Sequence, residues 1–179
     1  MLLVRSWPEH VPPAHPRIID AVTRVILPRA FDYAPLAGLD DDVLHLDWDV
    51  AVSPEDLHTF AVAARRKAAQ PLVGPCRVYP GSLHGTVARQ MAGARWNVRS
   101  SNGAGAMADC QPGDPSADLW GFAMVYLPRE ALAGFVHSNP GRDMSDIGFA
   151  GWHTAHAGPA RICWAVRPVH LNYPPPGQL

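Results

Sequence analysis

The sequence predicts an α/β sandwich with a mostly parallel central sheet. Short apolar runs alternate along the chain with segments whose apolar residues recur at helical spacing, as in helices packed on a sheet. One run, Val43 to Leu46, is apolar apart from His45, as expected for a central strand covered on both faces. A clear helix start follows at Ser53. A strand followed closely by a helix indicates the α/β class.

Composition indicates one soluble cytoplasmic domain. The 179 residues suffice for a core without disulfides, so we expect a single domain over residues 1–173 and a Pro-rich tail over 174–179. The formal net charge of −1 gives no reason to expect nucleic acid as a partner. The three cysteines are widely spaced and suit a reducing cytosol. No apolar run is long enough for a signal peptide or a membrane span.

Strands separated by polar or Pro-rich segments are predicted for the first part of the chain. The expected elements are a strand over Leu2 to Trp7, a Pro-rich stretch over Pro8 to Pro16, a short helix over Arg17 to Arg24, a strand over Val25 to Leu27, a turn at Asp40 to Asp42 and the strand over Val43 to Leu46.

The helix after that strand is the best-marked element. Ser53 is the expected N-cap, Pro54 fits the first helical position, and Asp56 completes a Ser-x-x-acid variant of the capping box. Residues at helical spacing then predict one buried stripe, formed by Leu57, Phe60, Ala61, Ala64 and Ala68.

In the remainder of the chain, strands are again predicted between helical or irregular segments. We expect strands at Leu72-Val73, Cys76 to Tyr79, Trp120 to Leu127 and Arg161 to Leu171, a mobile loop or lid over Ser100 to Ser116, a short helix from Pro128 through Phe135, and an irregular segment over Gly141 to Trp152.

The motif Asp47-Trp48-Asp49 closes the strand Val43 to Leu46, and it is the strongest functional clue. Open α/β sheets bind ligands at the carboxyl ends of their strands. Oxygen ligands suit Mg²⁺ or Mn²⁺, which proteins commonly hold by one or two carboxylates plus substrate phosphates. The same spacing recurs at Asp40 and Asp42 in a predicted turn, so spacing alone is weakly specific. A strand-end turn with solvated carboxylates is the alternative.

The segment from Val43 to Leu57 (VLHLDWDVAVSPEDL) resembles the metal-binding strand end of GT-A-fold nucleotide-sugar glycosyltransferases. A looser likeness extends to Trp120 to Leu132 (WGFAMVYLPREAL), to Ser145-Asp146 and to His170. The resemblance implies a Rossmann-like GT-A fold and sugar transfer from a nucleoside diphosphate sugar, such as a UDP- or GDP-sugar, to an unidentified acceptor. It also implies Mn²⁺ or Mg²⁺, a Lewis acid that stabilises charge on the leaving diphosphate.

The same resemblance assigns roles to the acidic motif and to a late histidine. By it, Asp49 contacts the metal directly, and Asp47 binds the metal through water or holds the ribose and sugar of the donor. His170 supplies a further metal ligand or a contact to the diphosphate. Trp48 is either a donor contact or a packing residue.

The acceptor side follows from the looser part of the likeness. Asp146 falls where inverting members of the family carry their general base, a group that contributes about 10² to 10⁴ in rate. Trp120, Gly121 and Phe122 are expected to form the sugar-facing edge, where glycine permits close backbone approach.

Two other functions stay open. A sugar-phosphate nucleotidyltransferase shares the acidic metal site, but it would carry a Gly-rich basic loop after the first strand, and Trp7 to Pro16 supplies none. A non-catalytic nucleotide- or carbohydrate-binding module with a degenerate site is favoured by the short chain before Asp47, where the family builds its base pocket.

Two histidine signals have simpler interpretations. His153 and His156 have HxxH spacing without the Glu and third ligand of a zinc motif, and their Gly and Ala neighbours argue against a helix there. His45, inside the buried strand, is expected to be a hydrogen-bonded core residue.

Overall fold

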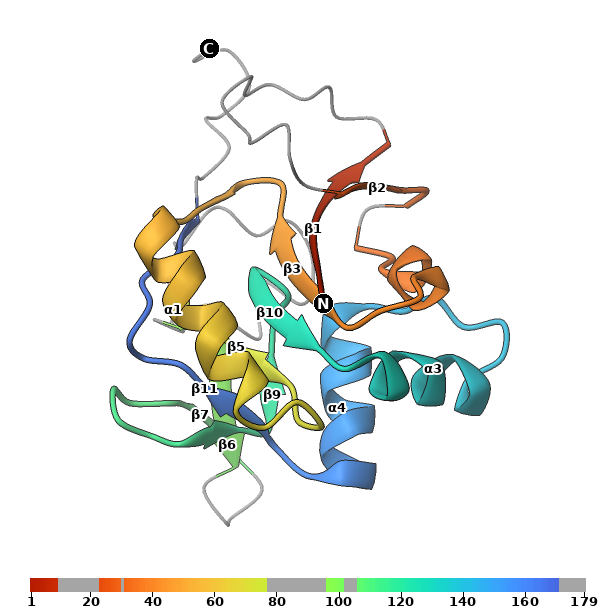
Figure 1. The fold of residues 1–179 in the computed structure, drawn as a ribbon. Coiled ribbons are helices and arrows are strands. Elements are labelled where there is room, and N and C mark those ends of the chain that lie inside the picture. Colours follow the sequence, from red (N-terminus) through yellow and green to blue (C-terminus); the bar gives the residue numbers. More distant parts are fainter. Residues whose placement is uncertain (10–22, 30, 77–95, 102–105, 171–179) are drawn as a thin grey trace, which may run out of the picture.

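The structure is a computed structural model that describes residues 1–9, 23–29, 31–76, 96–101 and 106–170 (Figure 1). The described strands are β1 (Leu2–Pro8), β2 (Thr23–Leu27), β3 (Val43–Asp47), β4 (Val50–Ala51), β5 (Leu72–Val73), β6 (Val98–Ser101), β7 (Met107–Asp109), β8 (Ser116–Ala117), β9 (Leu119–Trp120), β10 (Met124–Leu127), β11 (Ala160–Ile162) and β12 (Val169–His170). The described helices are η1 (Ala34–Gly38), a 3₁₀ helix, and the α-helices α1 (Pro54–Arg65), α3 (Arg129–Ser138) and α4 (Asp146–Ala157).

A mixed sheet of seven strands lies at the centre, in the order β2-β1-β3-β10-β5-β11-β8. β1 pairs in parallel with β2 and β3, and β5 pairs in parallel with β11. The pairs that β10 makes with β3 and β5, and that β11 makes with β8, are antiparallel. The α/β class is therefore confirmed. The sheet is only partly parallel, not mostly parallel as predicted, because side-chain patterns reveal a strand but not its direction.

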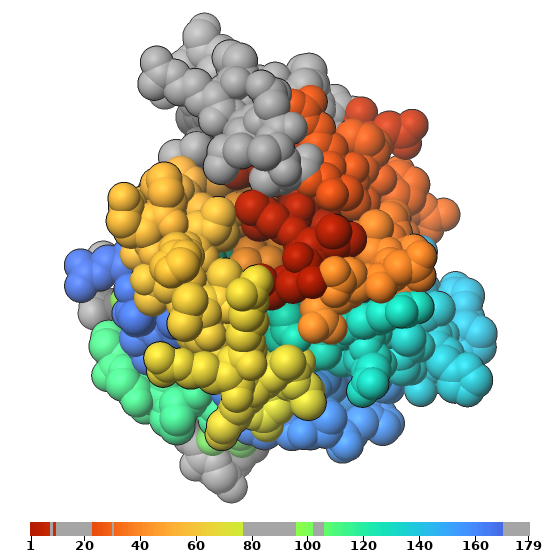
Figure 2. All heavy atoms as spheres, in the orientation of Figure 1, coloured from red at the N-terminus to blue at the C-terminus, as the bar shows by residue number. Residues whose placement is uncertain are grey.

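The helices cover the two faces of this sheet. Successive residues of β10 point to opposite sides: Tyr126 packs in one buried cluster with Phe60 of α1, and Val125 packs in the other with Phe149 of α4. α1 lies in front of the sheet in Figure 1, and in Figure 2 it covers this face beside the N-terminal strand. The strands β3 and β10 are thus buried on both faces, as their apolar sequences predict.

The local signals for α1 are confirmed at its start. The Ser53 hydroxyl accepts a hydrogen bond from the backbone N–H of Asp56, 3.0 Å away, and Pro54 is the first helical residue. The Asp56 carboxylate accepts from the backbone N–H of Arg167. Phe60 and Ala64 form the buried stripe, whereas Ala68 lies beyond the helix and is exposed. The predicted helix from Pro128 through Phe135 is also present, as α3.

The segment predicted to be irregular, Gly141 to Trp152, contains the start of α4. The Ser145 hydroxyl caps this helix by accepting from the backbone N–H of Gly148, 3.0 Å away. Phe149, Ala150 and His153 are its buried residues. The expectation that glycine and alanine would prevent a helix here is wrong, because burial of this face offsets the low helix propensity of glycine.

The expected loop or lid over Ser100 to Ser116 contains strands. β6 and β7 pair antiparallel, with Ser101 opposite Met107, and residues 102–105 lie outside the described residues. Short strands joined by a Gly-rich connection have too few residues to show an alternating pattern, so no strand was predicted there.

Two predicted long strands are each divided between two sheets. β9 pairs with β6 through Trp120 and Val98, and the chain then bends at Phe122 and Ala123 to enter the central sheet as β10. Likewise the predicted strand Arg161 to Leu171 is divided into β11 and β12. The breaks are hidden in the sequence because residues on both sides of them are apolar.

Some expectations fall wholly or partly outside the described residues. These are the Pro-rich stretch beyond Glu9, most of the helix Arg17 to Arg24, the strand Cys76 to Tyr79 beyond Cys76, and the tail 174–179. Thr23 and Arg24, at the end of that predicted helix, are described and belong to the strand β2. Within the described residues, no helix is long and apolar enough to cross a membrane.

Candidate functional site

The candidate site lies at the carboxyl end of β3, where the sheet topology brings four segments together. Ser6 of β1 is the register partner of Asp47, because these two strands run parallel. β10 runs antiparallel to β3, so the residues just before β10 reach the same edge, and Asp47 N donates to the carbonyl of Ala123 at 3.0 Å. The backbone N–H of Tyr33 donates to the carbonyl of Met144, which joins the start of η1 to the approach to α4.

Asp47 is enclosed by hydroxyl groups. Its Oδ1 lies 3.2 Å from Ser6 Oγ, and its Oδ2 accepts from the Tyr33 hydroxyl at 3.1 Å. The side chains of Asp47 and Asp49 are only 8% and 7% exposed. The acidic motif is therefore a buried pair at the edge of a sheet, and the interpretation as an exposed turn with solvated carboxylates is wrong.

His45 supports this end of the strand from within the core. The residue is fully buried, its Nδ1 donates to the Phe122 carbonyl at 2.8 Å, and its Nε2 lies 2.6 Å from Ser6 Oγ. Burial lowers the pKa of His45 to about 3, so the ring is neutral. The expectation of a hydrogen-bonded core histidine is confirmed.

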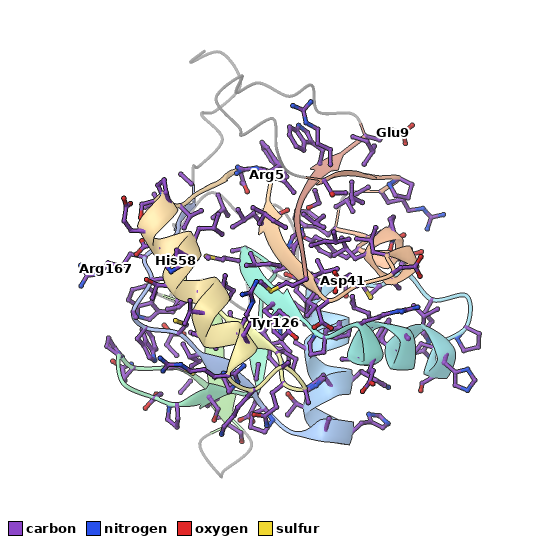
Figure 3. All side chains as sticks on the ribbon, viewed as in Figure 1. Arg5, Glu9, Asp41, His58, Tyr126 and Arg167 are labelled. Atoms are coloured by element: carbon purple, nitrogen blue, oxygen red, sulfur yellow. The ribbon has the colours of Figure 1, made fainter. Side chains whose placement is uncertain are left out.

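Arg5 fixes the turn that carries the two aspartates. Its guanidinium donates to the carbonyls of Trp48 and Val50, at 2.8 and 2.7 Å, from a side chain that is almost fully buried. Figure 3 shows Arg5 beside the chain that leaves β3. Burial lowers the pKa of Arg5, and its attraction to Asp47 and Asp49 acts in the opposite direction. A fixed positive charge thus compensates part of the negative charge of this turn, and Trp48, which is half-buried, contributes its carbonyl.

The carboxylates repel one another. Burial, followed by the charges of Asp49 and Asp146, raises the pKa of Asp47 to about 8, although the hydrogen bonds from Tyr33 and Ser6 lower it. Asp146 therefore lies close enough to act electrostatically on Asp47, although it is 99 residues away in the sequence. The fold concentrates negative charge at one edge of the sheet, where a cation or a proton relieves the repulsion.

Asp146 is the first residue of α4 and is only partly buried. Its Oδ1 accepts from the N–H of Ile147 at 2.7 Å, and its carboxylate also accepts from the backbone of Phe122. Burial raises its pKa against the effect of these bonds. A Cβ added at Gly121 would lie 3.3 Å from Asp146 Oδ2, so glycine allows this close approach. The structure thus brings Asp146, Gly121 and the Phe122 backbone together.

The aromatic rings of the expected sugar-facing edge are not on a surface. Trp120 is fully buried and Phe122 is 1% exposed, and both belong to the core cluster behind the sheet. The Phe122 backbone contacts His45 and Asp146, while its ring packs against Tyr33 and the Trp120 ring packs against His153.

His170 reaches the acidic turn through strand pairing. In β12 it is the register partner of Val50 of β4, which directly follows Asp49. Its side chain lies outside the described residues.

Within the described residues, no group of three or more His, Cys, Asp or Glu side chains is arranged to hold a metal ion. A cation at this edge would therefore depend on the oxygens of Asp47 and Asp49 together with those of a ligand. The two carboxylates fit Mg²⁺ or Mn²⁺, which proteins commonly bind with one or two carboxylates plus the phosphates of a substrate. The Nδ1 atoms of His153 and His156 donate to the carbonyls of Gly158 and Trp152.

Three residues that were not among the predicted site residues also shape the site: Arg5, Ser6 and Tyr33. The sequence offered one signal for Arg5, a charged residue within an otherwise largely apolar strand, because such a residue is seldom buried without a partner. Ser6 and Tyr33 carried no such signal, since their contacts with Asp47 join distant parts of the chain.

Among solved structures, the chain is similar to the crystal structure of A197 from STIV. The TM-score is 0.55 at 17% sequence identity, and the match covers 95% of this chain and 85% of that chain. At this identity the likeness shows the fold alone, an α/β fold with a mixed, partly parallel sheet of seven strands. No protein-family model and no curated protein sequence matches the chain.

Proposed function

We propose that this protein is a metal-dependent glycosyltransferase with a GT-A-like arrangement, transferring a sugar from a nucleoside diphosphate sugar to an acceptor hydroxyl. The observation that carries the proposal is the buried pair Asp47 and Asp49 on the turn after β3, electrostatically coupled to Asp146. The site lies at the carboxyl ends of β1 and β3, the edge where open α/β sheets bind ligands.

In this proposal, Asp49 and Asp47 hold Mn²⁺ or Mg²⁺ together with the diphosphate oxygens of the donor. The cation supplies Lewis-acid stabilisation of the charge that develops on the leaving diphosphate. Arg5 holds the backbone of the turn, so that the two carboxylates keep their places without a ligand. The resemblance to the family gives His170, whose backbone pairs with Val50, the role of a further contact to the metal or the diphosphate.

Asp146 acts as the base for the acceptor in an inverting reaction. The acceptor hydroxyl gives its proton to Asp146 as its oxygen bonds to the anomeric carbon, and the bond from that carbon to the diphosphate breaks. The raised pKa of Asp146 favours this role, because a base is most effective when its pKa approaches the working pH.

Metal-dependent nucleotide binding is the decisive test. Isothermal titration calorimetry should show that UDP or GDP binds only with Mn²⁺ or Mg²⁺, and that Asp49→Ala abolishes this binding. Asp40→Ala is the matched control, because Asp40 belongs to the other D-x-D sequence and is exposed. Metal-independent binding, or equal loss in both variants, would count against the proposal.

Asp146→Asn should lower turnover about 10² to 10⁴-fold, the usual contribution of a general base, with donor affinity nearly unchanged. Asp143→Asn is the control, since Asp143 is an exposed carboxylate three residues earlier that pairs with Arg29. Steady-state kinetics with the donor found by screening checks this expectation. Full activity of Asp146→Asn would exclude it as the base.

A non-catalytic binding module is a second candidate, favoured by two observations. Both Asp47 oxygens already have hydroxyl partners, and Arg5 supplies a built-in positive charge. Hydrolysis of a UDP- or GDP-sugar by the wild type, absent in Asp49→Ala, would decide for the enzyme. A sugar-phosphate nucleotidyltransferase would need a Gly-rich basic loop after the first strand, and the sequence from Trp7 to Pro16 does not contain one.

A further inference from the structure

His45 breaks the apolar pattern of a fully buried strand. Every residue of β3 is buried, and the side chain of His45 is 0% exposed. A polar side chain placed there gives up hydration that an apolar residue would not need, so its position calls for an explanation. Such departures from local sequence rules are expected at functional sites. In the proposed mechanism this residue has no role so far.

Each ring nitrogen of His45 has a polar partner of its own. Nδ1 lies 2.8 Å from the carbonyl oxygen of Phe122, and Nε2 lies 2.6 Å from Ser6 Oγ. Because a carbonyl oxygen can only accept, the hydrogen of the neutral ring is on Nδ1, and Nε2 is an acceptor. The ring therefore joins β1 to the segment before β10, on the two sides of β3 in the sheet.

From Ser6 the contacts continue to the acidic motif. Ser6 Oγ lies 3.2 Å from Asp47 Oδ1, on the opposite side from the second hydroxyl partner of that carboxyl group, Tyr33. Ser6 is fully buried, and its hydroxyl bridges His45 and Asp47. The place of this Asp47 oxygen therefore depends on the histidine ring through one intermediary.

From Phe122 the contacts continue to the candidate base. The Phe122 carbonyl accepts from His45, and the backbone of the same residue donates to the carboxylate of Asp146. The close approach of this segment has separate support, because a Cβ added at Gly121 would lie 3.3 Å from Asp146 Oδ2. The Phe122 ring packs on Tyr33, with ring centroids 4.7 Å apart, which restrains the segment further.

We propose that His45 is a positioning residue for both Asp47 and Asp146. It holds the first through Ser6 and the second through the backbone of Phe122, so that the two halves of the candidate site keep their relative places. The importance of those places for sugar transfer rests on the proposed function. A core histidine that only stabilises the sheet is the competing explanation, and it predicts no separate effect on either carboxylate.

Asparagine and glutamine separate the two contacts of the ring. The amide nitrogen of asparagine is bonded to Cγ, as Nδ1 is in histidine, so His45→Asn keeps a donor for Phe122 and loses the contact with Ser6. The amide of glutamine lies one atom farther from the backbone, near the place of Nε2, so His45→Gln keeps a partner for Ser6 and loses the bond to Phe122.

Two further changes complete the set of variants. Ser6→Ala removes the branch through Ser6 and leaves the histidine in place. His153→Asn and His153→Gln are the matched controls, because His153 is also buried, at 3% exposed, and its Nδ1 likewise donates to a backbone carbonyl, at 2.9 Å.

The first readout is the pair of ¹³C signals from the side-chain carboxyl groups of Asp47 and Asp146, recorded on the full chain without metal or nucleotide. Asp47→Asn and Asp146→Asn assign these signals by their loss. His45→Asn and Ser6→Ala should shift the Asp47 signal more than the Asp146 signal, and His45→Gln should do the reverse. The His153 variants should shift neither.

The second readout separates binding from turnover. In titration calorimetry with Mn²⁺, His45→Asn and Ser6→Ala should bind UDP or GDP about 10- to 100-fold more weakly, the usual cost of losing an outer partner of a metal ligand. His45→Gln should bind the nucleotide normally and turn over about tenfold more slowly, because it displaces the base.

The outcomes separate this inference from the proposed function. Equal shifts of both carboxyl signals in His45→Asn and His45→Gln, or no shifts, would overturn the inference, because the histidine would then only stabilise the sheet. If the signals divide as expected and the wild type binds neither nucleotide with metal, the inference stands and the glycosyltransferase proposal fails. Should the His45 variants not fold, Ser6→Ala decides alone, and an unmoved Asp47 signal in that variant overturns the inference.

Discussion

The carboxyl group of Asp47 has a different environment from an ordinary surface aspartate. Ser6 and Tyr33 place hydroxyls on its two oxygens, and burial, followed by the neighbouring carboxylates, disfavours its charged form. Without a cation, the folded protein therefore retains a proton on Asp47 at pH values where the unfolded chain has released it. A cation bound at the turn would replace that proton.

A stability prediction follows for Asp47. Its pKa is raised from 3.8 to about 8 on folding, so the stability that it contributes is complete below pH 3.8 and is lost as pH rises towards 8. Urea unfolding without divalent cations should show this loss in the wild type, with each unit of pKa difference equivalent to about 1.4 kcal/mol. Asp47→Asn, which keeps a neutral polar group, should lose this dependence.

The comparison between the two proteins isolates Asp47 from the other titrating groups. His45, whose pKa is lowered to about 3, acts in the opposite sense, because stability falls as pH drops below 6.5, and it is present in both proteins. Parallel pH profiles for wild type and Asp47→Asn would show that Asp47 is already ionised in the folded protein.

At the scale of elements, α4 links the candidate base to the rest of the site. The helix starts at Asp146 because the Ser145 hydroxyl caps it, and its buried residues anchor it behind the sheet. α1 has the same kind of cap at Ser53, with the same hydrogen-bond length, but its first residues do not belong to the site. The two helices therefore offer a matched comparison.

Ser145→Ala and Ser53→Ala should each lower the free energy of unfolding by about 1 kcal/mol, the usual cost of losing an N-cap side chain. Only Ser145→Ala should also lower turnover, because fraying of α4 displaces Asp146. Chemical denaturation and kinetic assays on both variants check this. If the Ser145→Ala and Ser53→Ala variants had equal turnover and equal free energies of unfolding, the α4 cap would not position the base.

At the scale of the whole molecule, two apolar clusters lie on opposite faces of the sheet and share its central strands. β3 and β10 contribute residues to both clusters, so damage to either cluster weakens the same strands. This arrangement favours a single cooperative unfolding unit and gives the single-domain expectation a direct test.

Phe60→Leu, on the α1 face, and Phe149→Leu, on the α4 face, should each destabilise the protein by about 1 to 3 kcal/mol. Both should shift one common transition followed by tryptophan fluorescence and by far-ultraviolet circular dichroism. Phe31→Leu, at an exposed position, should leave it unchanged. Two separate transitions, each shifted by one variant, would indicate two folding units.

The sequence by itself determined the elements that short-range chemistry encodes. β1, β3, α1 and α3 were predicted because apolar spacing, N-caps and prolines act within one or two turns of chain. The place of the Asp47 and Asp49 pair at a strand end, and the burial of His45, followed from the same local pattern.

Only the tertiary structure decided the direction of the strands, the division of the long apolar runs between sheets, and which residues contact Asp47. Ser6 is 41 positions from Asp47 in the sequence, and Tyr33 is 14 positions from it. Such contacts depend on how the sheet is ordered, which side-chain periodicity does not specify. The raised pKa of Asp47 has the same origin, since burial and the charge of distant Asp146 arise only when the chain is packed.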